Sequence, residues 1–265
     1  MSDTPQSENW WLASNGKWYP PTASSGMPLP PPPPTARTAG GPNKVPSGLS
    51  GTLQGFMWAA AAMLAISALL GIGGFSALDS AWNSNGNWQA VEDIDTAIGI
   101  FSGLQVLIAL VTFVLIIVWS YRAYSVSEAL GANHRSFSSG WAIGAWFIPL
   151  ANALLPRLVL RDIEKVISEQ NSIGGGGSVQ SSPPAALGWI WWASYVVCNA
   201  LYVIGLSTYD NLDGTYETWQ TGYTLIAFGG GGYAVSAVLG ALYIRGLTRS
   251  VNMAATSAGQ STDYQ

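Results

Sequence analysis

Four long stretches without a charged residue dominate the hydropathy pattern of this chain. Each is longer than the roughly 20 residues that an α-helix needs to cross a hydrocarbon core about 30 Å thick. None alternates between apolar and polar positions as a strand does, and a backbone in lipid must satisfy its hydrogen bonds internally. The pattern therefore predicts an all-α membrane protein with four transmembrane helices, at about residues 52–77, 96–121, 185–207 and 222–244.

A fifth apolar stretch, residues 141–155, differs from these four. Its 15 residues would make a helix of only about 22 Å. Pro149 and Asn152 interrupt it, and Pro156 ends it. Such a length is typical of a re-entrant or interfacial segment rather than a span. We therefore expect a re-entrant or interfacial helical motif over 140–168, between the second and third transmembrane helices.

The composition supports a membrane protein. Charged residues make up 9% of the chain, against about 25% in an ordinary soluble domain, and hydrophobic residues make up 49%. The net charge of -4 excludes a basic nucleic-acid binder. The single cysteine excludes an internal disulfide framework and a cysteine-built metal site. The partner that the composition predicts is the lipid bilayer.

The charged residues predict the topology. The connections 78–95 and 208–221 hold acidic residues and no Lys or Arg, and all ten basic residues lie elsewhere. Cytoplasmic loops carry an excess of Lys and Arg. We therefore expect a multi-pass protein of the cell membrane, with both termini and the central section 122–184 in the cytoplasm.

Two polar segments flank the membrane domain of residues 51–249. Residues 1–50 are Pro-rich and have too little apolar surface to offset their ordering entropy, so we expect a disordered cytoplasmic tail without a signal peptide. Within it, residues 10–21 are expected to form a short aromatic hairpin, because Asn15-Gly16 is a strong two-residue turn signal. Residues 250–265 are expected to form a second cytoplasmic tail.

Basic and aromatic residues mark the predicted cytoplasmic membrane surface. Arg157, Arg161 and Lys165 recur every four residues after Pro156, which is the pattern of an interfacial helix with a basic face near anionic lipid. A surface helix packed on the spans explains the spacing equally well. Arg122, at the end of the second span, is a further candidate for lipid contact. Three tryptophans at the start of the third span are typical of an aromatic belt: Trp189, Trp191 and Trp192.

Small residues at four-residue spacing predict close packing between the spans. We expect this packing within one bundle rather than between two copies, and the oligomeric state stays open. The residues concerned are Gly55 and Ala59, Gly99 and Gly103, and Gly232, Ser236 and Gly240.

No catalytic constellation is visible in the sequence. The only histidine, His134, lies in a loop, and Cys198 lies in the middle of the third span. No ionisable group of the kind that ion-coupled transporters keep lies inside a span. Asn152 and Asn199 are the strongly polar groups that we expect at membrane depth, as hydrogen-bond partners of other helices. We expect no enzyme, no cofactor and no metal site.

The segment Gly140-Trp-Ala-Ile-Gly-Ala-Trp-Phe-Ile-Pro-Leu-Ala-Asn152, continued by Pro156-Arg-Leu-Val-Leu-Arg-Asp-Ile163, resembles the signature of a membrane family. That family is the actinobacterial domain-of-unknown-function family 4328, and Trp119-Ser-Tyr-Arg122 fits its context over about residues 52–249. The resemblance implies four membrane helices with this block between the second and third, and no known activity. The positions that it marks as a family motif and candidate interaction site are Gly140, Trp141, Gly144, Trp146, Phe147, Pro149, Asn152, Pro156, Arg161 and Asp162.

Near the N-terminus, Trp10-Trp-Leu-Ala-Ser-Asn-Gly-Lys-Trp-Tyr-Pro-Pro21 is similar to domain-of-unknown-function family 2510, although the order of its aromatic elements departs from the usual form. Such a module ahead of the spans suggests a protein partner for the N-terminal aromatic and Pro-rich tail.

Three hypotheses on function remain. The first is a non-enzymatic interaction or scaffold protein of the cell membrane. The alternative is a small transporter or channel-like protein in which the Pro149–Asn152 block lines a path as a discontinuous helix. A membrane enzyme ranks third, because no substrate groups can be placed.

Overall fold

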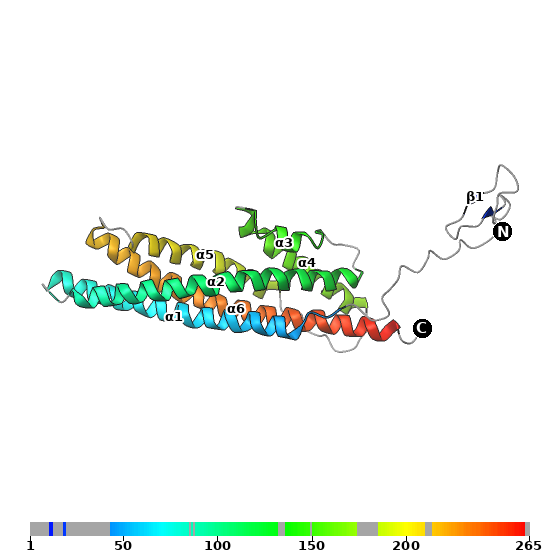
Figure 1. Ribbon diagram of the computed structural model, residues 1–265, viewed down its shortest axis with the longest axis horizontal. Helices are drawn as coiled ribbons and strands as arrows, with labels where there is room; N and C mark the ends of the chain where they lie inside the picture. The colour runs from blue at the N-terminus through cyan, green and yellow to red at the C-terminus, as the bar shows by residue number, and fades with distance from the viewer. Residues whose placement is uncertain are drawn as a thin grey trace. The chain divides into compact units, whose positions relative to one another are not determined.

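The computed structural model describes residues 11–12, 18–19, 43–84, 86, 88–131, 136–148, 150–173, 185–209 and 214–262 (Figure 1). The chain divides into two compact units, Met1–Gly40 and Gly41–Gln265. The second unit contains the helices α1 (Ser47–Asn83), α2 (Gln89–Ala129), α3 (Trp141–Gly144), α4 (Leu155–Ile173), α5 (Ala185–Tyr209) and α6 (Tyr216–Thr262), and a short 3-10 helix, η2 (Ala151–Ala153).

In the first unit, two short strands pair antiparallel. The strand β1 (Trp11–Leu12) pairs with β2 (Trp18–Tyr19), with Trp11 opposite Tyr19 and Leu12 opposite Trp18. This pairing is the one that a hairpin over 10–21 requires. The Asn15-Gly16 turn and most of the tail 1–50 lie outside the described residues.

Four long antiparallel helices form the second unit (Figure 1). Helix α1 packs against α2 and α6, and α5 packs against α6, so the spatial order is α2, α1, α6, α5. All four helices are long and apolar enough to cross a membrane. The predicted fold class, an all-α membrane protein with four transmembrane helices, is thus confirmed.

The membrane-facing surface is apolar. Large side chains stand out from α2 in particular, where Leu107, Leu110 and Val114 are each about 60% exposed. Exposed apolar area of this extent is unusual for a soluble protein and is expected where lipid replaces water as the solvent. The buried core lies in two clusters, one around Trp119 and Tyr243 and one around Tyr223.

The two ends of this bundle differ in charge. We call the end at which α1 and α5 begin and α2 and α6 end the basic end, and the opposite end the acidic end. The acidic end carries Asp79, Glu92, Asp93, Asp95 and Glu217. The described basic residues all lie at or near the basic end: Lys44, Arg122, Arg157, Arg161, Lys165, Arg245 and Arg249.

The helices are longer than the spans predicted from hydropathy. Helix α6 has 47 residues, which is about 70 Å, more than twice the thickness of a hydrocarbon core. It continues through Thr262, so most of residues 250–265 is helix continuous with the fourth span rather than a separate tail. Leu247, Val251 and Ala255 lie one turn apart and are buried in the core at the basic end, which stabilises this extension.

Glycines bring α6 close to its neighbours. An added Cβ at Gly229 would lie 2.5 Å from the backbone nitrogen of Tyr202 in α5, and one at Gly71 would lie 2.8 Å from that of Ala227. An added Cβ at Gly232 or Gly240 would instead meet a side chain of α5, that of Cys198 or Trp191, so both glycines pack closely as predicted for the fourth span. The prediction is wrong for three glycines that would contact nothing within 4 Å: Gly55, Gly99 and Gly103.

The segment between α2 and α4 runs back along α2. The hydroxyl of Tyr124 donates to the carbonyl oxygen of Phe137, and Trp146 meets Phe113 edge to face at 5.9 Å between ring centroids. Phe113 lies in the apolar part of α2, about 12 Å along the helix from Tyr121. Instead of one helix, this segment contains α3 and η2. Whether it is re-entrant or interfacial stays a prediction.

Candidate functional site

A buried ion pair joins α4 to α5 and α6. Nη2 of Arg157 lies 3.1 Å from Oε1 of Glu164 and donates to the carbonyl oxygen of Ala185 at 3.1 Å. The hydroxyl of Tyr243 donates to the same Oε1 at 2.5 Å. The guanidinium also lies over the ring of Trp189, 4.9 Å from its centroid. These contacts offset part of the cost of removing two charges from water, because Nε and Nη1 of Arg157 have no hydrogen-bond partner among the described residues.

A second buried carboxylate joins α4 to α2 and to the segment that follows α2. Oδ2 of Asp162 accepts from the backbone nitrogen of Ser136 at 3.0 Å and lies 2.9 Å from the hydroxyl oxygen of Tyr124. The backbone nitrogen of Phe137 also donates to this carboxylate, at 3.4 Å. We call Arg157, Asp162 and Glu164 together the α4 clamp, because they attach this helix to three of the four spans.

We expect Asp162→Ala to detach the segment around Ser136 from α4. Two part-buried backbone N–H groups would lose their acceptor, which costs less than the roughly 1–3 kcal/mol of a fully buried donor without a partner. Hydrogen–deuterium exchange of the amides of residues 136 and 137 should become markedly faster, while the amides in the middle of α6 exchange as in the wild type. Unchanged exchange at residues 136 and 137 would contradict the assigned role. Glu169→Ala, which changes a half-buried acid on the same helix, is the control.

One predicted lipid contact is wrong. Arg157 is completely buried, so it is not part of a basic face at the lipid surface. Its position lies one turn before Leu160, on the side of α4 that packs on the bundle. Arg161 and Lys165 are exposed on the other side, and Arg122 is exposed on α2. The four-residue spacing wrongly suggested one shared face. Four residues turn an α-helix by about 400°, so each successive basic residue is rotated by about 40° around the helix axis.

The residues of the family motif are distributed between surface and core. Those exposed are Gly140, Trp141, Phe147 and Arg161. Those half-buried are Gly144 and Asn152, and those buried are Trp146, Pro156 and Asp162. Pro149 lies outside the described residues. The buried motif residues therefore have structural roles. Trp146 packs in the core, Pro156 lies in the first turn of α4, and Asp162 belongs to the α4 clamp.

Aromatic side chains fill the space between this motif and the spans. Trp191 and Trp192 are each only 3% exposed, so the prediction of an aromatic belt is wrong for both. Trp192 meets Trp146 edge to face at 5.8 Å between centroids, and its Nε1 donates to the carbonyl oxygen of Ala153 at 2.6 Å. Trp191 packs on Tyr243 at 5.1 Å. The aromatic cluster thus extends to the Tyr243 end of the α4 clamp.

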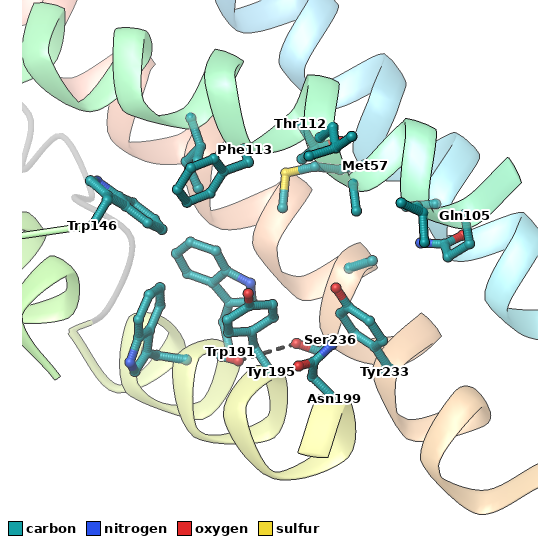
Figure 2. Close-up of a pocket in the computed structure, with 17 residues that line it drawn as sticks. Met57, Gln105, Thr112, Phe113, Trp146, Trp191, Tyr195, Asn199, Tyr233 and Ser236 are labelled. Carbon is teal, nitrogen blue, oxygen red and sulfur yellow. Dashed lines mark hydrogen bonds between the residues drawn. The ribbon is translucent and has the colours of Figure 1, made fainter. Parts of the chain in front are cut away.

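Beside this cluster lies a cavity of about 350 Å³ between α2 and α5 (Figure 2). Residues of α1, α2, α5 and α6 line it, and Trp146 lines the part nearest to the basic end. Most of the lining is apolar or aromatic. The polar side chains on it are Gln105, Thr112, Tyr195, Asn199, Tyr233 and Ser236.

The interpretation of polar groups at membrane depth missed one residue. Gln105 of α2 is 6% exposed and lines the cavity, and its Oε1 has no hydrogen-bond partner among the described residues. Asn199 lines the cavity as well, whereas Asn152 does not. The backbone N–H of Asn152 donates to the carbonyl oxygen of Ile148, within the turn that leads into η2. Gln105 is the one amide side chain in the second span, which was a signal that the sequence offered.

The arrangement offers binding surfaces on α4 and in the cavity. Within the part of the chain that the structure describes, no three His, Cys, Asp or Glu side chains are placed to hold a metal ion. Each carboxylate of the α4 clamp accepts hydrogen bonds from the protein itself. His134 lies outside the described residues.

Comparisons with known proteins identify the family. No curated protein and no solved structure matches the chain. A family model described as Domain of unknown function (DUF4328) matches residues 83–249, from the end of α1 into α6. The match is narrower than the resemblance over 52–249, because it leaves out nearly all of α1. The chain belongs to the DUF4328 family of membrane proteins of unknown function.

Proposed function

We propose that this chain is a non-enzymatic interaction or scaffold protein of the cell membrane whose basic end faces the cytoplasm. The α4 clamp carries the proposal: a rigidly attached helix that keeps Arg161 and Lys165 exposed beside the ends of the spans. Removing charges from water is costly, so the presence of the α4 clamp supports a helix that must hold one position.

The partner that this surface fits best is an anionic lipid headgroup. Arg161 and Lys165 lie one turn apart on α4 and present two cations on one side of the helix. A further exposed cation, Arg122 of α2, lies at the same end. Each such cation near an anionic membrane surface contributes about 1 kcal/mol. A protein partner that binds the N-terminal aromatic and Pro-rich segment is the second contact that we propose.

The described cavity gives the transporter alternative no support. Asn152 does not line the described cavity, and its backbone is engaged in a turn. A discontinuous helix that lines a path should present its polar groups to that path. The cavity itself favours a bound small molecule, which is a separate matter from transport.

Neutralising the surface of α4 tests the proposal. The full chain is placed in nanodiscs of phosphatidylglycerol and phosphatidylcholine, and retained lipids are counted by native mass spectrometry. We expect the double variant Arg161→Gln/Lys165→Gln to lose its preference for phosphatidylglycerol by roughly thirtyfold, since two cations contribute about 2 kcal/mol.

A second double variant, Lys44→Gln/Arg249→Gln, removes the same charge from exposed positions outside α4. It should keep most of the preference. An equal loss in both variants would mean that only net charge matters, and no loss in either would refute lipid binding by α4. Arg161→Lys/Lys165→Arg, which keeps both charges, should show the wild-type preference for phosphatidylglycerol.

A further inference from the structure

The cavity between α2 and α5 has an aromatic end and a polar end (Figure 2). Trp146 and Phe113 lie at the aromatic end, where Trp191 and Trp192 complete the wall. Their rings meet edge to face, at 5.9 Å for Phe113 with Trp146 and 5.7 Å for Trp191 with Trp192. Rings fixed in this way form a rigid wall that suits a flat, apolar group.

Gln105 provides the polar end. Figure 2 shows its side chain at the opposite end of the cavity from Trp146. Its Oε1 is buried and accepts no hydrogen bond within the described chain. A buried amide oxygen normally has a partner, so this one calls for a hydrogen-bond donor from outside the protein. Ser236 is not a substitute, because its hydroxyl already donates to the carbonyl oxygen of Trp191.

The lining also determines the charge and the size of a ligand. Among the described residues that form it there is no Asp, Glu, Lys, Arg or His, so a charged ligand would find no partner there. Gln105 and Phe113 are eight residues apart on α2, which places the two ends about 12 Å apart. The volume of about 350 Å³ is typical of a site for one small molecule.

The side from which a ligand enters follows from α2. Val106 and Leu110 line the cavity, and both are more than half exposed on the apolar surface of the bundle. The rim of the cavity therefore reaches the surface that lipid covers, within the apolar part of the helix. A ligand dissolved in the membrane can reach this rim without passing through water.

We propose that this cavity binds an uncharged, elongated lipophile that carries a ring system at one end and a hydroxyl group at the other. The ring lies against Trp146 and Phe113, and the hydroxyl donates to Oε1 of Gln105. The ligand enters sideways from the bilayer between α2 and α5. This site is independent of the surface of α4 that the proposed function uses.

A pair of two-ring probes tests the proposal. The full chain in nanodiscs is titrated with a bromo-hydroxybiphenyl and with bromobiphenyl, whose bromine quenches tryptophan fluorescence on contact. Partition into empty nanodiscs is subtracted. We expect saturable quenching by both probes, with the hydroxylated probe bound about tenfold more tightly, because one buried hydrogen bond separates them.

Two variants locate the binding. Gln105→Leu should bind bromobiphenyl as the wild type does and lose the tenfold preference for the hydroxyl. Gln54→Leu, the same substitution at a residue of α1 that does not line the cavity, should keep that preference. Ala237→Phe fills the cavity and should weaken the binding of both probes. If this variant does not fold, the comparison of Gln105→Leu with Gln54→Leu still tests whether Gln105 binds the hydroxyl.

Three results would overturn the proposal. One is quenching that is linear and equal to partition, which means that no site exists or that an acyl chain of the bilayer occupies it permanently. Another is the same preference for the hydroxyl in Gln105→Leu as in the wild type. The third is an unweakened affinity in a folded Ala237→Phe variant, which would place the probes elsewhere.

Discussion

Arg157→Met is expected to lower the free energy of unfolding by about 3–5 kcal/mol. The substitution leaves the carboxylate of Glu164, a residue only 6% exposed, with Tyr243 as its remaining described partner. It also removes the bond to the carbonyl oxygen of Ala185 at the start of α5. The loss is measured by titrating the protein in mixed micelles with dodecyl sulfate and following tryptophan fluorescence.

Two further variants show whether the uncompensated charge causes that loss. Arg161→Met, the same change on the exposed side of α4, should cost less than about 0.5 kcal/mol. Arg157→Met/Glu164→Gln removes both charges and keeps an acceptor for the hydroxyl of Tyr243, so it should recover at least half of the stability. A single variant that is as stable as the wild type would show that the ion pair does not hold α4.

Gly229→Ala should destabilise the bundle by about 1–3 kcal/mol. The new methyl group would lie 2.5 Å from the backbone nitrogen of Tyr202, and a backbone atom cannot turn aside as a flexible side chain can. Helices α5 and α6 would have to separate along their shared contact, which also forms one wall of the cavity. The same dodecyl sulfate titration measures the cost.

Gly55→Ala is the matched control. Its methyl group would contact nothing within 4 Å, and alanine is a better helix former than glycine by about 0.5–1 kcal/mol. This variant should therefore be as stable as the wild type or slightly more stable. If both variants behaved alike, helix propensity rather than the contact between α5 and α6 would explain the result.

The motif residues show how far sequence reasoning reaches at the site. Trp146, Pro156 and Asp162 were singled out by a resemblance, and each has a structural role in the bundle. The sequence could not predict their contacts, because residues such as Asp162 and Tyr124 are hydrogen-bonded although they lie 38 positions apart in the chain. Arg157 and Glu164 lie seven residues apart, which is two helical turns, so their shared face was open to sequence reasoning and was missed.

The sequence by itself determined that the chain crosses a membrane four times in helices, since long uncharged stretches have no other stable form in lipid. It also separated the acidic end from the basic end, because charges resist crossing the hydrocarbon core. Only the tertiary structure decided which charges are buried in the α4 clamp and which tryptophans lie in the core rather than at the lipid interface. It also decided where α2 and α5 enclose a cavity. Those features depend on contacts between residues distant in the chain, and such contacts leave no periodic pattern along it.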